Sequence, residues 1–329
     1  MASGAGFVAA RGARSALIVA STTYQDSALT ELRAPAADAE ALAGVLSDPE
    51  IGGFDVRTLL NEPAHVVNEA VEEFFTDRSP DDLLLLHFAC HGIKDQEGEL
   101  YLAMANTRLR LLAATAVAAN FVNRRMTQSR SRRIVLFLDC CYAGAFDRGM
   151  TTRTSNVMDL ADRFSGRGRA VITASGAVEY AFEGGELTES GDPAPSVFTT
   201  AMVRGLGSGE ADRDQDGYVD LDELYDYVYD AVREVTPHQT PGKWTFGVQG
   251  DLVIARRSTA VTEPVALPPE IQQSLDSSLA GVRAGAVDEL ARLLSGRHQG
   301  LSLAARRALE ALVDDDSRSV AASASAALG

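Results

Sequence analysis

Two kinds of hydrophobic pattern alternate along the first part of the chain. Short, mostly apolar runs predict strands, and they cover residues 15–21, 54–60, 82–89, 133–138, 169–173 and 251–255. The run over 82–89 is nearly all apolar, as expected for a strand with both faces of the sheet covered. Segments with apolar residues at helical spacing predict helices, and they cover residues 36–46, 66–75, 113–126, 196–206 and 222–232. A short hairpin arm is expected over residues 99–104. This alternation predicts crossover connections around a mostly parallel sheet, which is an α/β fold.

The pattern changes after a proline-rich segment. We divide the chain into a main domain (1–257), a linker (258–269) and a helical tail (270–329) that is rich in Ala and Leu. The tail contains a weak internal echo, with Val282 and Val320 each preceded by an Asp-Ser pair and 38 residues apart. HEAT-like helical repeats and a helical hairpin packed on the main domain explain this echo equally well. Because two repeats rarely stand alone, we expect the tail to pack on another surface or to recruit a protein partner.

Composition and charge exclude several classes of function. The 329 residues include 46% hydrophobic and 23% charged residues, which is ordinary for a globular protein. The net charge is −16, and a chain of this sign repels phosphate backbones, so nucleic acid is not an expected partner. Eight acidic residues and one arginine lie between positions 212 and 230. The acidity is therefore concentrated at one place, which marks a candidate site.

We expect a cytoplasmic protein without a membrane segment or an organic cofactor. No apolar run approaches the ~20 residues of a membrane span, and the apolar stretch after Arg14 is too short for a signal peptide. The chain has two lysines, Lys94 and Lys243, and neither lies in a phosphate-binding loop motif. No glycine motif of the dinucleotide-binding type follows a predicted strand. Three cysteines, Cys90, Cys140 and Cys141, form no disulfide framework.

A histidine and a cysteine follow two of the predicted strands. His91 comes after the strand over residues 82–89, and Cys141 comes after the strand over residues 133–138. Neighbouring strands of a parallel sheet end at the same edge, so the two side chains can meet there. A cysteine nucleophile needs such a base because the thiolate is the reactive form. A zinc site made by Cys90, His91, Cys140 and Cys141 is an alternative, but these residues contain no C-x-x-C spacing.

The segments around these residues resemble the motifs of a known family. The block Leu84–Gly92 (LLLHFACHG) resembles the strand and His-Gly motif of caspase-like peptidases. The block Val135–Gly144 (VLFLDCCYAG) resembles the Asp-x-Cys-x-x-Gly nucleophile motif of their bacterial and plant relatives, the metacaspases. Three further blocks are similar: Ala34–Leu42, Thr173–Glu183 and Ser196–Thr199. The resemblance covers roughly residues 14–256 and implies a caspase-like three-layer sandwich with a central, mainly parallel sheet.

The resemblance also implies catalytic roles. His91 would be the general base and acid, and Cys141, rather than Cys140, would form the acyl-enzyme. The backbone N–H groups of Gly92 and Cys141 would form the oxyanion hole that stabilises the developing negative charge. The family requires no third catalytic group, and we predict none.

Substrate preference is also carried over from the resemblance. Metacaspases cleave after Arg or Lys, and Asp139 and Glu179 match the acidic residues of their substrate pocket, where carboxylates bind a guanidinium group. Arg33 lies near the position of an arginine with which caspases bind Asp instead, so an acidic preference stays open. Four arginines between residues 144 and 168 make that segment a candidate for self-cleavage, as in related enzymes.

Residues 212–223 match the twelve-residue EF-hand calcium loop at every position. The predicted ligands are Asp212, Asp214, Asp216, the carbonyl group of Tyr218, Asp220 and Glu223. Gly217 occupies the position that needs a sharp turn, and hard oxygen ligands favour Ca²⁺. The ion would either regulate activity or act as a structural staple, and an acidic turn that caps a helix is the alternative without a metal.

These observations predict a cysteine endopeptidase with a Cys–His dyad that acts on proteins or peptides. The expected process, from the resemblance, is regulated proteolysis in bacterial defence or cell death. Two alternatives stay open. One is a catalytically silent scaffold that binds partners, and the other is a different thiol-dependent acyl-transfer enzyme on the same fold.

Overall fold

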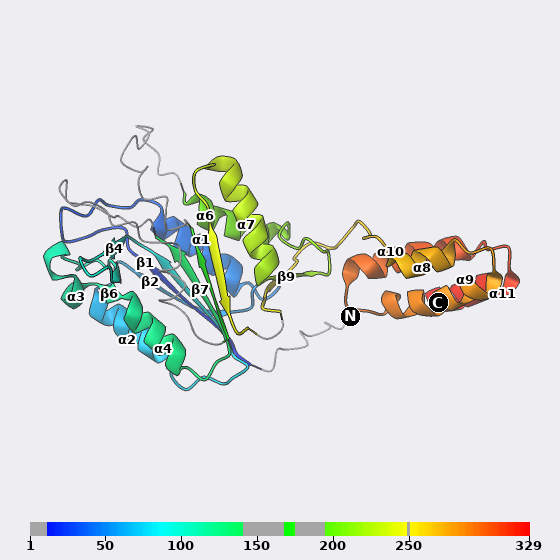
Figure 1. Ribbon diagram of the computed structural model, residues 1–329, viewed down its shortest axis with the longest axis horizontal. Helices are drawn as coiled ribbons and strands as arrows, with labels where there is room; N and C mark the ends of the chain where they lie inside the picture. The colour runs from blue at the N-terminus through cyan, green and yellow to red at the C-terminus, as the bar shows by residue number, and fades with distance from the viewer. Residues whose placement is uncertain (1–11, 141–167, 175–194, 249–250) are drawn as a thin grey trace.

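The computed structural model describes residues 12–140, 168–174, 195–248 and 251–329. Six strands form the main sheet in the order β10-β8-β7-β3-β1-β2 (Figure 1). Their bounds are Arg14–Ala20 (β1), Asp55–Leu60 (β2), Leu83–Ala89 (β3), Arg133–Asp139 (β7), Arg169–Thr173 (β8) and Gly242–Phe246 (β10). Each neighbouring pair is parallel except β10 and β8. The mostly parallel sheet predicted from the apolar runs is therefore confirmed.

Helices cover both faces of this sheet (Figure 1). One layer contains α1 (Pro35–Ser47), α6 (Val197–Ser208) and α7 (Leu221–Val235), and the other contains α2 (Ala64–Phe75) and α4 (Ala119–Gln128). Because successive strand residues point to opposite faces, Ile18 of β1 joins the core beneath the first layer, and Leu17 and Val19 join the core beneath the second. The predicted three-layer α/β sandwich is confirmed.

The single helix predicted over residues 113–126 is wrong. This segment forms a short helix, α3 (Leu112–Thr115), a strand, β6 (Val117–Ala118), and most of α4. Thr115 ends α3, and its hydroxyl group donates to the Leu111 carbonyl, a local bond that competes with helix continuation. The strand β6 then pairs with β5 (Leu100–Leu102), which also pairs with β4 (Gly92–Lys94). The expected hairpin arm thus belongs to a small three-stranded sheet.

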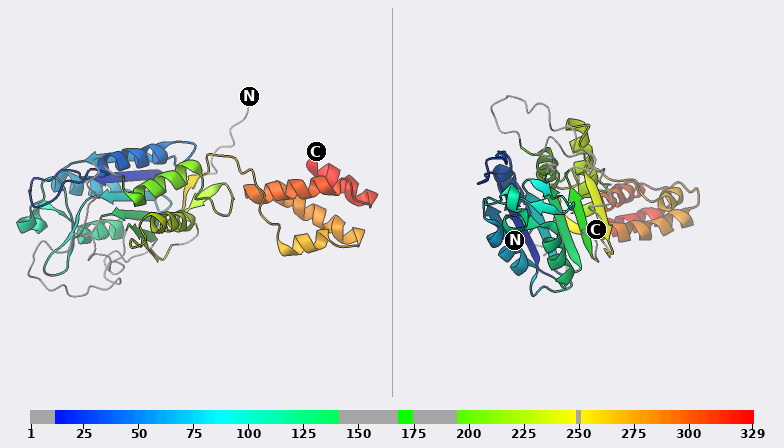
Figure 2. Two further views of the ribbon diagram at one scale, coloured as in Figure 1. Left: turned by 90° about the horizontal axis from the view of Figure 1, so that it is seen from above. Right: turned by 60° about the vertical axis from the view of Figure 1, so that its left-hand side comes forward.

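A second small sheet leads into the tail. It consists of β9 (Tyr218–Asp220) and β11 (Val253–Arg256), paired antiparallel. The tail helices are α8 (Pro269–Leu275), α9 (Ala280–Leu294), α10 (Gln299–Leu312) and α11 (Arg318–Leu328). They pack on one another around Leu290, Leu309 and Val320. The tail projects from the end of the main domain where β9 lies (Figures 1 and 2).

A buried ion pair joins the two halves of the internal echo in the tail. The guanidinium group of Arg283 in α9 donates to both carboxylate oxygens of Asp315, at 2.7 and 2.8 Å, and to the Ser277 carbonyl at 2.8 Å. Bidentate pairs of this kind fix orientation as well as energy. The segments before α9 and α11 are therefore held together. Among the described residues, no helix has the length and apolar character that crossing a bilayer requires.

Candidate active site

The candidate catalytic residues follow two adjacent strands. Ala89 at the end of β3 lies opposite Asp139 at the end of β7, and both strands run in the same direction. His91 lies two residues after Ala89, and Gly92 begins β4. Cys141 lies two residues after Asp139, but it is outside the described residues, as is Glu179. The sheet register therefore brings the chain segments that lead into His91 and Cys141 to the same edge of the sheet.

The ring of His91 is held by backbone groups of the loop between β1 and α1. Its Nε2 atom lies 2.7 Å from the Thr30 carbonyl oxygen. Because a carbonyl can only accept, Nε2 carries the proton, and in the neutral ring the lone pair is then on Nδ1. This arrangement gives the imidazole the form that a general base needs. The Thr30 carbonyl is an orienting group that the sequence did not reveal.

Tyr24 supports the same histidine from the same loop. Its ring centroid lies 5.1 Å from that of His91. Its hydroxyl group accepts from the His91 N–H at 3.3 Å and donates to the Ser21 carbonyl at 3.0 Å. Burial raises the pKa of Tyr24, so the hydroxyl group keeps its proton. Tyr24 is thus a second positioning residue that the sequence did not reveal.

Two carboxylates from different elements meet beside this edge of the sheet. Asp139 accepts from the Thr199 hydroxyl group at 2.7 Å, and Asp38 of α1 accepts from the Ser196 N–H at 3.0 Å. Both partners lie at the start of α6, where Ser196 is the N-cap residue. Within the described ranges, no basic side chain forms an ion pair with either carboxylate. Asp38 is therefore an acidic site residue that we did not predict.

Burial shapes the protonation of this acidic pair. Burial raises the pKa of Asp38 to about 6, the Ser196 N–H lowers it, and the neighbouring Asp139 carboxylate raises it further. Burial also raises the pKa of Asp139, against the lowering effect of hydrogen bonds from Ser196 and Thr199. Two carboxylates that are costly to ionise together favour a positively charged ligand. Arg33, the alternative pocket residue, is exposed two positions before α1.

Two of the three cysteines considered for a zinc site are buried in the core, and Cys141 lies outside the described residues. Cys90 and Cys140 are each 2% exposed, and burial raises the pKa of the Cys90 thiol. A zinc ligand must be a thiolate, which this environment disfavours. Among the described residues, the one group of side chains with metal-ligating geometry is Asp212, Asp214 and Asp216.

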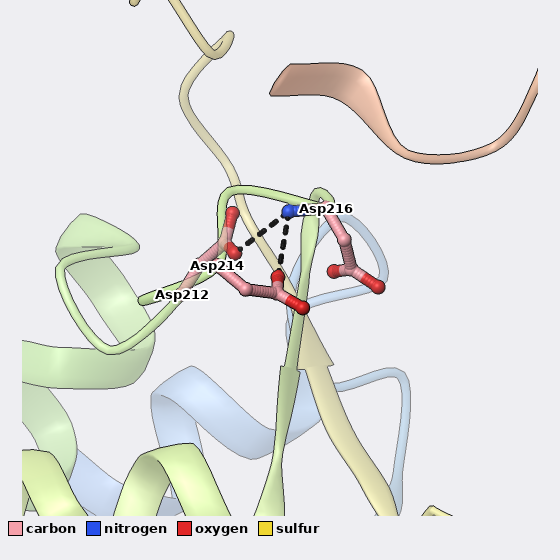
Figure 3. Close-up of side chains that lie close together, drawn as sticks. All are labelled: Asp212, Asp214 and Asp216. Carbon is pink, nitrogen blue, oxygen red and sulfur yellow. Dashed lines mark hydrogen bonds between the residues drawn. The ribbon is translucent and has the colours of Figure 1, made fainter. Parts of the chain in front are cut away.

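These three aspartates lie close together in the loop (Figure 3). One carboxylate oxygen from each lies within 4.8 Å of the others. Gly217 has φ +96°, which supplies the required turn. The Glu223 carboxylate points back to the loop and accepts from the N–H groups of Arg213 and Asp214 at 2.9 and 3.1 Å. The donors and the turn fit a hard divalent cation.

The remaining predicted ligands lie just beyond this cluster. Tyr218 and Asp220 begin and end β9, and Asp220 caps α7. In place of a second calcium loop, β9 pairs with β11 of the same domain. Burial raises the pKa of Asp216, of Asp220, and of Glu223 to about 6. A bound cation would offset the cost of ionising these crowded carboxylates.

Comparison with known proteins places this architecture. A model of the caspase-domain family (peptidase C14) matches residues 13–250. Caspase-1 from Spodoptera frugiperda is 15% identical, with a TM-score of 0.50 over 76% of this chain and 92% of that chain. The pro-form of that caspase is also 15% identical, with a TM-score of 0.50 over 74% and 94% of the two chains.

A protein from Geobacter sulfurreducens has 16% identity and a TM-score of 0.50 over 72% of this chain and 95% of that chain. No curated protein sequence matches the chain. The family match spans both strands that end at the candidate dyad and the helix that holds the acidic pair. The chain therefore belongs to the caspase-domain family of cysteine-peptidase-like proteins.

Proposed function

We propose that this protein is a cysteine endopeptidase in which Cys141 is the nucleophile and His91 is the general base. The observation that carries this proposal is the fixed His91 ring, whose Nε2–H group is held by the Thr30 carbonyl. The adjacent strand β7 leads directly into Cys141. An oriented imidazole at the end of a neighbouring strand is what a thiol nucleophile requires.

The proposed reaction begins when Nδ1 of His91 takes the thiol proton. The thiolate of Cys141 attacks the substrate carbonyl carbon, and the N–H groups of Gly92 and Cys141 bind the oxyanion. Histidine then protonates the leaving amine, and the amide C–N bond breaks to leave a thioester. Water activated by the same histidine hydrolyses this thioester. Throughout, the Thr30 carbonyl stabilises the imidazolium form by accepting from Nε2–H.

We further propose cleavage after Arg or Lys. Asp38 and Asp139 place two carboxylates beside the catalytic edge, and the start of α6 holds both. A guanidinium group binds such a pair through charge-assisted hydrogen bonds. The exposed position of Arg33 gives no comparable support to an acidic preference. Glu179 stays a candidate third carboxylate.

Calcium is the third part of the proposal. The loop at residues 212–223 combines the full EF-hand pattern with clustered Asp212, Asp214 and Asp216 oxygens. It lies directly after α6, whose other end holds the acidic pair. A cation in this loop would therefore stabilise the helix that positions the substrate pocket. By resemblance to bacterial relatives, the process would be regulated proteolysis in defence or cell death.

Fluorogenic peptides that differ only in Arg, Lys or Asp before the scissile bond test these points. Each is assayed with Ca²⁺ and with a chelator, and Cys141→Ala is the matched inactive control. We expect cleavage after Arg and Lys that is lost in the Cys141→Ala variant and reduced by the chelator. Cleavage after Asp would contradict the acidic pocket. Absence of thiol-dependent cleavage under every condition would favour a catalytically silent scaffold.

A further inference from the structure

The calcium-type loop also contacts the helical tail. The first two N–H groups of α10 donate to loop carbonyl groups: Gln299 to Asp216 at 3.2 Å and Gly300 to Gln215 at 2.8 Å. The next two N–H groups donate to His298: that of Leu301 to the ring atom Nδ1, and that of Ser302 to the backbone carbonyl. The first N–H groups of a helix have no partner within the helix. The loop therefore completes the cap of α10 across the boundary between domain and tail.

Two glycines allow this close approach. A Cβ atom on Gly217 would lie 2.2 Å from Nε2 of Gln299. A Cβ atom on Gly300 would lie 2.9 Å from Val265 and 3.1 Å from the Gln215 carbonyl oxygen. At Gly217 the neighbouring atoms belong to the flexible Gln299 side chain, whereas at Gly300 they include the Gln215 backbone. A larger residue at Gly300 would therefore push the start of α10 away from the loop.

The loop residues at this interface are also part of the cation loop. Asp216 offers its carboxylate to the cation cluster and its carbonyl group to Gln299. Gln215 has φ +62°, a left-handed conformation that is unfavourable for a residue with a side chain. Its carbonyl direction therefore depends on the loop being held in this shape. Figure 3 shows a segment of the tail beside Asp216.

Charge within the loop opposes this shape. Residues 212–223 contain six acidic side chains and one arginine, a net charge of −5. This charge attracts the positive N-terminal end of α10, but both groups lie in contact with solvent, so salt screens the attraction. Repulsion among clustered carboxylates acts at shorter range and favours opening of the loop. A divalent cation removes this repulsion. We expect this gain in loop order to outweigh the weaker attraction between the loop charge and the end of α10.

We propose that cation occupancy of loop 212–223 controls docking of the helical tail on the main domain. This inference rests on the calcium part of the proposed function. Linkage requires the reverse effect as well: docking of α10 strengthens cation binding by the same factor. Displacement of the tail would therefore weaken cation binding at the end of α6.

Hydrogen exchange of the full-length chain tests the first direction. The readout is the exchange rate of peptides that cover the start of α10, with Ca²⁺ and with a chelator. We expect the chelator to accelerate exchange at Gln299 and Gly300. The Glu223→Gln variant should show the fast rate even with Ca²⁺, since it removes a ligand charge. Equal rates with and without Ca²⁺ in the wild-type chain would overturn the proposal.

Calcium affinity, measured by titration calorimetry, tests the reverse direction. Gly300→Leu should undock α10 and weaken Ca²⁺ binding about fivefold or more. Gly285→Leu is the matched control, because a Cβ atom there meets nothing within 4 Å. Gly300→Ala provides a milder change if the leucine variant does not fold. Unchanged affinity in both Gly300 variants, with tail exchange accelerated, would overturn the coupling.

These measurements do not depend on catalysis. Cleavage that depends on Cys141, together with a loop that binds no Ca²⁺, would refute the coupling and leave the peptidase assignment intact. Calcium-coupled tail exchange in a chain that cleaves nothing would refute the peptidase assignment alone.

Discussion

Asp38 is a buried carboxylate near the start of α1 that is 5% exposed. Burial raises its pKa to about 6, so its contribution to stability is present below the unfolded pKa near 4 and is lost as pH rises through 6. Keeping this charged group at neutral pH is costly for folding. This cost is consistent with a role in binding a cationic side chain.

The Asp38→Asn variant should separate stability from substrate binding. At pH 8 its free energy of unfolding should exceed that of the wild type by up to about 3 kcal/mol, and the difference should vanish near pH 4. Its KM for an Arg peptide should rise about tenfold or more, because one carboxylate of the pair is lost. Urea unfolding and peptide kinetics measure both effects. Glu40→Gln, at an exposed position of the same helix, is the control. If the stability of Asp38→Asn varied with pH in the same way as that of the wild type, the raised pKa of Asp38 would be contradicted.

His87 is a buried histidine in the middle of β3. It is 0% exposed, and neither ring nitrogen has a hydrogen-bond partner in the part of the chain that the structure describes. Burial lowers its pKa to about 4. The stability that the neutral ring contributes is therefore fully present above the unfolded pKa near 6.5, and it is lost as pH falls through 4. The sign is opposite to that of Asp38. This residue is therefore a source of acid sensitivity in the core.

The His87→Leu variant should resist acid better than the wild type. Between pH 6.5 and pH 4 the wild type should lose up to about 3 kcal/mol that the variant keeps. Acid-unfolding curves followed by circular dichroism measure the difference. His65→Gln, at an exposed position of α2, should follow the wild type. Superimposable curves for the wild type and His87→Leu would show that the histidine does not titrate on unfolding.

At the residue scale, the sequence indicated the chemistry but not its supports. His91 follows a predicted strand and the acidic loop matches a spaced motif, whereas the pocket role of Asp139 came from the family resemblance. The Thr30 carbonyl is a backbone group, which has no sequence signature. Asp38 resembles an ordinary acidic residue in the first turn of a helix, and only the packing of α1 against α6 brings it to Asp139. Cys141 and Glu179 lie outside the described residues, so they stay predictions.

At the element scale, α6 connects the Asp38–Asp139 pair to the acidic loop 212–223. Its first turn holds the acidic pair, and its left-handed C-cap residue, Gly209, stands three positions before Asp212. Thr199 of this helix is fully buried and donates to Asp139. Leaving a buried acceptor without such a donor lowers the free energy of unfolding. The helix therefore depends on this bond as well as on its own packing.

Thr199→Val should destabilise the protein by about 1–3 kcal/mol, because the buried Asp139 carboxyl group is then left without this donor. Thr199→Ser keeps the hydroxyl group, so its loss should be smaller, about 0.8 kcal/mol for one methyl group. Denaturant titrations measure the free energy of unfolding of both variants. Equal losses in the two variants would rule out the bond as the cause.

The clearest predictions were of strands that are buried along most of their length. Strands β1, β3 and β7 are apolar on both faces, and runs of this kind are unambiguous. The edge strand β10 was missed because most of its residues are only partly buried, so its sequence lacks a continuous apolar run. Strand β9 was missed because it lies inside the acidic loop motif. The helix predicted through Thr115 failed because apolar spacing does not reveal a local side-chain bond.

At the scale of the whole molecule, the acidic loop 212–223 and the candidate catalytic edge lie at opposite ends of the main sheet. Arg14 at the start of β1 donates to the Val253 carbonyl of β11, and β11 pairs with β9 of the loop. His91 instead follows the far end of β3. A cation bound in the loop would therefore lie at the opposite end of the sheet from His91. It would act through the stability of the fold and through the helices that join the two ends, and not by contact with the substrate.

Calcium should therefore stabilise the folded chain by mass action. At about 100 times its Kd, Ca²⁺ should add about 2.7 kcal/mol to the free energy of unfolding, which raises Tm by about 5–10 °C for a domain of this size. Scanning calorimetry with Ca²⁺ and with a chelator measures the shift. The Glu223→Gln variant should lose most of it, since a charged ligand of the loop is replaced by a neutral amide. A shift of the same size in that variant would place the stabilising ion elsewhere in the molecule.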